Sequence, residues 1–129
     1  MTGFLLDTNV ILLAGFRSAA LSQSVKSAIE RGPNYLSVIS YWEVALKNMK
    51  GRLDVGDPRI WWSEALKQMA ATPLLLRAEH IAELWLLPPL HSDPFDRILI
   101  AQARVEMLTL LTTDSTVSAY ASRHFQVIH

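Results

Sequence analysis

Four carboxylates stand directly after short apolar segments or in the first turn of a predicted helix: Asp7, Glu43, Asp96 and Asp114. Carboxylate oxygens are the ligands that Mg²⁺ prefers, and the ion keeps several waters when it binds to a protein. A bound Mg²⁺ or Mn²⁺ can polarise a phosphoryl oxygen, lower the pKa of a water and stabilise a leaving oxygen. The four residues could therefore be both the metal ligands and the catalytic residues of a phosphodiester hydrolase.

Each acidic residue in this pattern also has a purely structural explanation as a helix cap. Ser40 and Glu43 have the spacing of a capping box, and Asp93 precedes a proline in the position of an N-cap residue. Asp114 could cap a final helix, and Asp7 could form an Asx turn with its own backbone. Capping explains the acids one at a time, but it does not require that they meet in space.

The elements that must position these acids alternate along the chain. The apolar segments predict buried strands over residues 4–6, 35–39, 74–76, 109–111 and 126–128. The stretches between them predict helices over residues 10–14, 22–31, 40–50, 57–71, 79–86, 93–106 and 115–123. This alternation predicts an α/β fold, a three-layer α/β/α sandwich with a central, mostly parallel sheet. Because the carboxyl ends of parallel strands share one edge, we expect the four acids to converge there.

Composition and charge limit the possible functions. The chain has 129 residues, half of them hydrophobic, which predicts one globular domain over residues 1–129. Twelve basic residues balance twelve acidic ones, so any contact with nucleic acid must use local basic patches or metal ions. The absence of cysteine excludes disulfides and fits the cytoplasm. No apolar run is long enough to span a membrane, and polar residues interrupt the apolar N-terminal segment, which argues against a signal peptide.

Four segments of the chain carry recognisable motifs. They cover residues 5–9, 40–44, 91–103 and 111–114, and the third of them is the most specific. In this order they resemble the motifs of PIN-domain nucleases, of the VapC toxin type found in prokaryotic toxin–antitoxin pairs. The resemblance extends over essentially the whole chain.

The resemblance implies a ribonuclease toxin that hydrolyses RNA phosphodiester bonds with Mg²⁺ or Mn²⁺ on an α/β/α sandwich. It assigns the metal-binding quartet to Asp7, Glu43, Asp96 and Asp114. Asp93 belongs to the same motif, and we expect it to cap its helix and to add charge behind the metal ligands. The resemblance also implies a homodimer and an antitoxin protein that blocks the site.

Several neighbours of the acids could support the chemistry. The hydroxyls of Thr8 and Thr113 could orient a carboxylate or a water in the second shell of ligands, or form local turn hydrogen bonds. His91 could act as a general acid or shape the loop that follows it. Arg97 could contact a phosphate or form an exposed ion pair.

A local basic patch is the feature that a neutral RNA-binding chain most needs. Lys47, Lys50 and Arg52, together with Arg17, could form such a patch, although each could equally belong to a solvated helix face.

Two other functions are compatible with this sequence. A phosphohydrolase with an aspartyl nucleophile would use Asp7, but such enzymes usually carry a second aspartate where this chain has Asn9. A non-catalytic PIN-like module would keep the fold and act through contact alone, and the complete acidic quartet argues against it.

Overall fold

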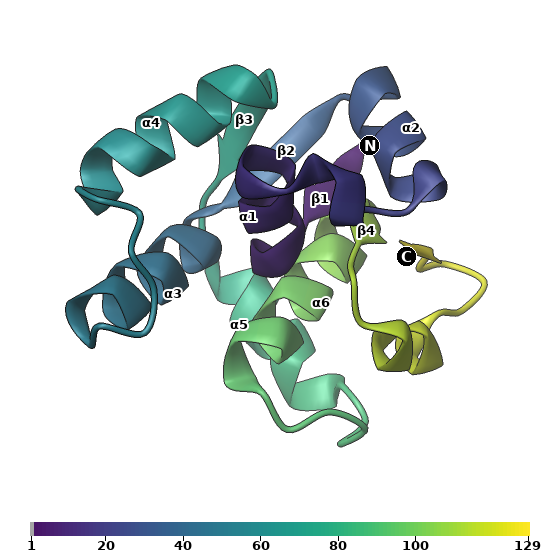
Figure 1. The fold of residues 1–129 in the computed structure, drawn as a ribbon. Coiled ribbons are helices and arrows are strands. Elements are labelled where there is room, and N and C mark those ends of the chain that lie inside the picture. Colours follow the sequence, from purple (N-terminus) through teal and green to yellow (C-terminus); the bar gives the residue numbers. More distant parts are fainter. Residues whose placement is uncertain (1) are drawn as a thin grey trace.

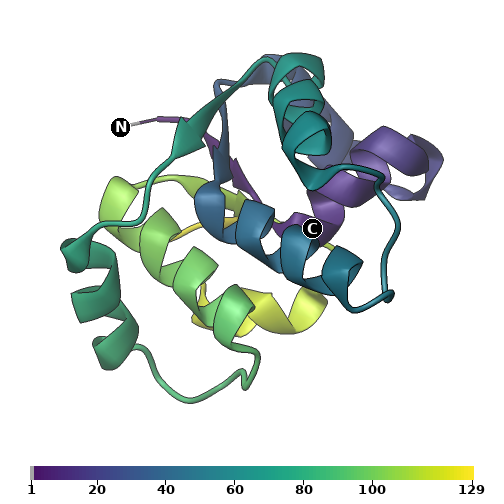
Figure 2. The same cartoon turned by 90° about the vertical axis from the view of Figure 1, so that its left-hand side faces the viewer.

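The computed structural model describes residues 2–129 and contains a parallel sheet between two layers of helices (Figure 1, Figure 2). The strands lie in the order β3-β2-β1-β4-β5, and all four pairings are parallel. Their bounds are β1 Phe4–Leu6, β2 Asn34–Ser37, β3 Ala71–Leu74, β4 Thr109–Leu111 and β5 Val127–Ile128. The predicted three-layer α/β/α fold is therefore confirmed.

Six α-helices and two 3₁₀ helices surround the sheet in the described part of the chain. The α-helices are α1 Thr8–Phe16, α2 Gln23–Arg31, α3 Val38–Met49, α4 Pro58–Gln68, α5 Ala78–Leu86 and α6 Pro94–Glu106. The 3₁₀ helices are η1 Ser18–Ala20 and η2 Ser115–Tyr120. Between residues 2 and 129 no helix has the length and apolarity that a bilayer crossing requires.

Two hydrophobic cores hold the layers together. Leu5 and Leu6 in β1 point to opposite faces of the sheet, and neither side chain is exposed to solvent. Leu6 belongs to the core under α1, α2 and α4, while Leu5 belongs to the core under α5, α6 and η2. Complete burial stabilises the fold by about 1.5–3 kcal/mol for each leucine. The central strand β1 is thus fixed from both sides, and Asp7 follows it directly.

The prediction that Ser40 caps the helix carrying Glu43 is wrong. Helix α3 begins at Val38, and the cap is Ser37, whose hydroxyl accepts the backbone N–H of Ile39 at 3.0 Å. Ser40 lies inside the first turn. The β-branched residues Val38 and Ile39 suggested a longer strand, but they are the first residues of the helix.

Other predicted bounds also differ from the structure, and α1, expected over residues 10–14, extends over Thr8–Phe16. β3 lies at 71–74 rather than 74–76, because it is an edge strand that tolerates Pro73. α4 ends at Gln68, two residues before Ala70 takes a left-handed φ of 47°. The expected final helix over 115–123 is a shorter 3₁₀ helix, η2. By contrast, the residues predicted for β1 and β4 match the structure, and α6 follows its predicted cap, Asp93.

Candidate functional site

All four carboxylates predicted to act together line one cavity of about 250 Å³ at the carboxyl edge of the sheet. Asp7 follows β1 and is the N-cap of α1, while Asp114 follows β4 and is the N-cap of η2. Glu43 projects from α3, and Asp96 lies in the first turn of α6. Residues from both ends of the chain therefore meet, because parallel strands end at the same edge.

The cavity holds negative charge at a free-energy cost. Burial raises the pKa of Asp7, and the nearby carboxylates of Glu43 and Asp114 raise it further, against hydrogen bonds from the Thr112 hydroxyl and the Val10 N–H. Desolvation is also the largest reason why the pKa of Asp96 rises to about 6. The charges of its acidic neighbours add to this rise. A bound cation would favour the ionised carboxylates and so remove much of this cost.

Glu43 is held in place through both of its carboxylate oxygens. The hydroxyl of Thr8 donates to Oε1 at 2.6 Å, and Lys47 Nζ lies 2.8 Å from Oε2 one turn along α3. Thr8 therefore orients a carboxylate instead of bonding within its own turn. Of the cations expected to form a basic patch, Lys47 lines this cavity, whereas none of the other three does within the described chain.

His91 connects two of the acids. Its Nδ1 accepts the backbone N–H of Asp93 at 3.2 Å, so the neutral ring carries its proton on Nε2. That nitrogen lies 3.1 Å from Asp114 Oδ2 and 3.4 Å from Asp96 Oδ2. The hydroxyl of Thr116 is the largest cause that lowers the pKa of Asp114, and the hydrogen bond from His91 is the next. Ligand atoms of His91, Asp96 and Asp114 all lie within 4.8 Å of one another, so a metal ion could bind among them once Nε2 of His91 has lost its proton.

The remaining predicted neighbours, Thr113 and Arg97, hydrogen-bond to groups other than the four carboxylates, although Thr113 lines the acidic cavity. Thr113 accepts a hydrogen bond of 2.8 Å from the Asn9 side chain, which ties α1 to the loop after β4. The guanidinium group of Arg97 donates to the carbonyl oxygens of Pro88 at 3.0 Å and His91 at 3.3 Å. Among the described residues it forms no ion pair. It fixes the loop that leads into α6.

Sequence reasoning missed two contacts around the acids. The position of His91 in the motif segment 91–103 was a signal for its contact with Asp96, although it did not show that Asp114 would also lie there. The hydrogen bond from Thr112 to Asp7 joins the ends of the neighbouring strands β1 and β4, and nothing in the local sequence indicated it.

Asp93 combines a cap with a charge, and two substitutions should separate these effects. Its Oδ1 accepts the N–H groups of Phe95 at 2.9 Å and Asp96 at 3.4 Å. We expect Asp93→Ala to lower the free energy of unfolding by about 1 kcal/mol in urea denaturation, because the cap is lost. Asp93→Asn should keep wild-type stability, since asparagine caps equally well. Equal losses in both variants would show that charge, not capping, is what stabilises the helix.

Comparison with known proteins agrees with this architecture. The family model described as PIN domain matches residues 4–122. The chain is structurally similar to VapBC2 from Rickettsia felis bound to a promoter DNA fragment, with a TM-score of 0.70, 15% identity, and coverage of 99% of this chain and 98% of that chain. FitAcB from Neisseria gonorrhoeae gives a TM-score of 0.65 at 21% identity, covering 98% and 96%.

A toxin–antitoxin complex from Klebsiella pneumoniae gives a TM-score of 0.62 at 19% identity, covering 97% and 95% of the two chains. At these identities the likeness shows a shared fold. No curated protein matches the sequence.

Proposed function

Because the chain belongs to the PIN domain family, we propose that it is a divalent-metal-dependent endoribonuclease and the VapC-type toxin of a toxin–antitoxin pair, acting in the cytoplasm. The observation that supports this most directly is the single cavity lined by Asp7, Glu43, Asp96 and Asp114. Helix capping predicts contacts of each acid with its own backbone, but it gives no reason for carboxylates from four elements to line one cavity.

The donor set fits Mg²⁺ or Mn²⁺, both of which prefer oxygen ligands. We assign Asp7, Glu43, Asp96 and Asp114 as the residues that would hold the ion. When bound, the metal supplies a Lewis acid that polarises the scissile phosphate and acidifies water. A bound cation would lower the raised pKa values of Asp7 and Asp96, because its positive charge stabilises the ionised carboxylates.

Residues around the acids have separate roles in this proposal. Thr8 orients the Glu43 carboxylate. Lys47, at the wall of the same cavity, can move its ammonium group from Glu43 to a phosphate oxygen of the RNA. The Nε2–H of His91 donates to Asp114 and lies 3.4 Å from a carboxylate oxygen of Asp96, so the ring holds these two acids beside it.

The proposed partners are an antitoxin and a second copy of the chain. Similar structures include one described as a toxin–antitoxin complex, which motivates the first of these partners. Phe16 on α1 and Ile60 on α4 are exposed apolar side chains beside a cavity of about 370 Å³, and we assign this surface to the antitoxin. Trp85 on α5 is 88% exposed and is a candidate contact of the homodimer.

A phosphohydrolase with Asp7 as nucleophile is less well supported. The second acid that such enzymes need would occupy position 9, where the side chain of Asn9 instead donates to Thr113. The Oδ1 atom of Asp7 already accepts the backbone N–H of Val10 at 2.9 Å. Trapping a phosphorylated Asp7 would support this alternative instead.

Incubation of the purified protein with a panel of cellular RNAs, with Mn²⁺ or with EDTA, tests the proposed activity. We expect discrete cleavage products with Mn²⁺ and none with EDTA. Single-stranded DNA of matched length serves as the control substrate for RNA specificity. Absence of Mn²⁺ binding in a calorimetric titration would contradict the proposal and support a binding module without catalysis.

A further inference from the structure

A second cavity, of about 750 Å³, lies at the opposite edge of the sheet from the acidic one. Gly3 and Phe4 at the start of β1 line it, together with Thr109 at the start of β4. Its basic side chains are Arg31, Arg104, Arg123 and His124, and its described lining contains no carboxylate. We call it the basic cavity. It is the local concentration of positive charge that a chain of zero net charge would need to bind a polyanion.

Two guanidinium groups of the basic cavity are available to a ligand. Arg31 lies over the ring of Phe4 at 5.5 Å from its centroid, which holds the side chain against the strand. Within residues 2–129 neither Arg31 nor Arg123 forms an ion pair, whereas Arg104 lies 3.0 Å from a carboxylate oxygen of Glu83. Arg31 and Arg123 can therefore bind anions without first breaking a salt bridge.

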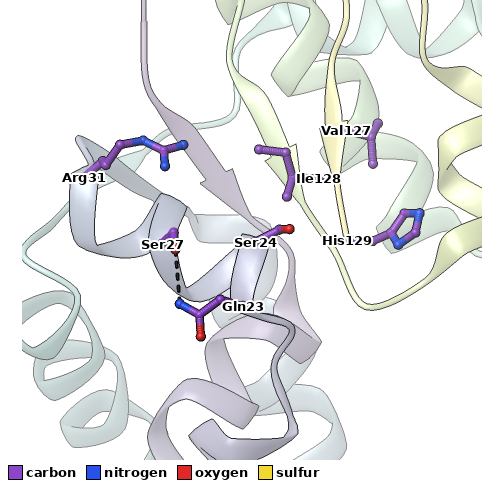
Figure 3. A pocket seen from close by; sticks show the side chains of 7 residues that line it. All are labelled: Gln23, Ser24, Ser27, Arg31, Val127, Ile128 and His129. Carbon is purple, nitrogen blue, oxygen red and sulfur yellow. Dashed lines mark hydrogen bonds between the residues drawn. The ribbon is translucent and has the colours of Figure 1, made fainter.

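A groove lies between α2 and β5, and Figure 3 shows the side chains that line it. This α2–β5 groove has a volume of about 630 Å³ and is lined by polar side chains of Gln23, Ser24 and Ser27 and by His129. Arg31 and Ile128 line both the groove and the basic cavity, so the two are contiguous. In the described residues no aspartate or glutamate side chain lines the groove either.

One residue of the α2–β5 groove, Ile128, is hydrogen-bonded to the strand end that leads to an acid of the acidic cavity. The carbonyl oxygen of Ile128 accepts the backbone N–H of Thr112 at 3.0 Å. Two residues later, Asp114 lines the acidic cavity. A polymer that enters the acidic cavity can therefore continue past β5 toward Arg31, which lines the groove together with Ile128.

We propose that the α2–β5 groove and the basic cavity bind the phosphates of the single-stranded nucleic acid that extends beyond the cleaved bond. This inference rests on the proposed nuclease function and adds a binding surface remote from the acids. Arg31 and Arg123 attract phosphates, and no aspartate or glutamate side chain among the described residues lines the groove or the basic cavity, which we together call the track. The acidic cavity needs a metal to accept a phosphate, whereas this track needs none.

The test compares wild type with the double variant Arg31→Gln/Arg123→Gln and with a charge-matched control on α4, Arg59→Gln/Lys67→Gln. Fluorescent single-stranded RNAs of 4 and 16 nucleotides are titrated in EDTA at several NaCl concentrations, with binding followed by anisotropy. For the longer RNA we expect about a tenfold loss of affinity in the double variant at 0.15 M salt. The slope of log affinity against log salt should fall by about 1.4, which is 0.7 for each lost phosphate contact. In EDTA the short RNA can also bind only along this surface, so it should lose affinity too, but by less because it offers fewer phosphates, and the control should change little.

Because Arg31 also contacts Phe4, thermal melting of the double variant is measured, and Arg123→Gln alone should show about half the change in salt slope. Wild-type affinity and slope in the double variant would overturn the inference. Equally strong competition by polyglutamate would also overturn it, because it would assign the track to an acidic peptide. Absence of RNA cleavage by wild type, with the affinity loss still present, would refute the proposed function and leave this binding surface intact.

Discussion

Replacing Asp7 with asparagine is expected to lower RNA cleavage at least about a hundredfold while the protein remains folded. A hundredfold loss corresponds to about 2.7 kcal/mol of transition-state stabilisation, which is within the contribution of a metal ligand. Asparagine can still accept the Val10 N–H, so the start of α1 keeps its cap. The loss of a buried charge beside Glu43 and Asp114 also removes repulsion. Cleavage rates and thermal melting measured on one preparation check both parts of the prediction.

A matched control for this substitution is Asp57→Asn. Asp57 is also an N-cap aspartate, at the start of α4, and its carboxylate binds Arg59 outside the acidic cavity. We expect wild-type cleavage from this control and a loss like that of Asp7→Asn from Asp96→Asn. Wild-type cleavage by Asp7→Asn or Asp96→Asn would remove these residues from the metal site.

Saturating Mn²⁺ is expected to raise the melting temperature, and the increase should grow as the pH rises from about 4 to 7. At a hundred times the dissociation constant, binding stabilises the fold by about 2.7 kcal/mol, which is roughly 8 °C for a domain of this size. Protons compete with the metal for carboxylates, so binding weakens in acid. Melting curves with Mn²⁺ or EDTA across this pH range provide the measurement.

The pH dependence without metal follows from the raised pKa of Asp96. Its pKa is about 6 in the folded protein and 3.8 as the ordinary value, so the folded state holds the proton more tightly. Between these values the unfolded chain loses its proton first, and the stability falls as the pH rises. Below about 4 and above about 6 this group adds no further change. Asp7, whose pKa is also raised, acts in the same direction.

The variant Asp96→Asn isolates this contribution. Without metal it should lose much of the decline in stability between pH 4 and 6, since the titrating group is gone. Other titrating groups, among them Asp114 with its lowered pKa, remain in both proteins and cancel in the comparison. An unchanged decline in Asp96→Asn, or no effect of Mn²⁺ on wild-type melting, would contradict the assigned role of Asp96.

Local sequence signals determined most of the elements that carry the acids. The cap Asp93 followed by Pro94 predicted the start of α6, because proline at the first helical position loses no hydrogen bond. Prediction failed where two local patterns were both plausible. Ser37 and Ser40 can each cap a helix, and the choice depends on where β2 stops pairing with β1. Pairing of that kind is a property of the sheet, not of the segment.

The sequence by itself determined the fold class and the identities of the four acids, because periodicity and motif order are local properties of the chain. The contacts among side chains were decided only by the tertiary structure. His91 lies between Asp96 and Asp114, and Arg97 binds loop carbonyls instead of a phosphate or an acid. Likewise, Arg31 and Arg123 meet in one cavity although 92 positions separate them in the numbering. Packing of α2 on the sheet and pairing of β5 with β4 bring these distant residues together, and no local pattern encodes that distance.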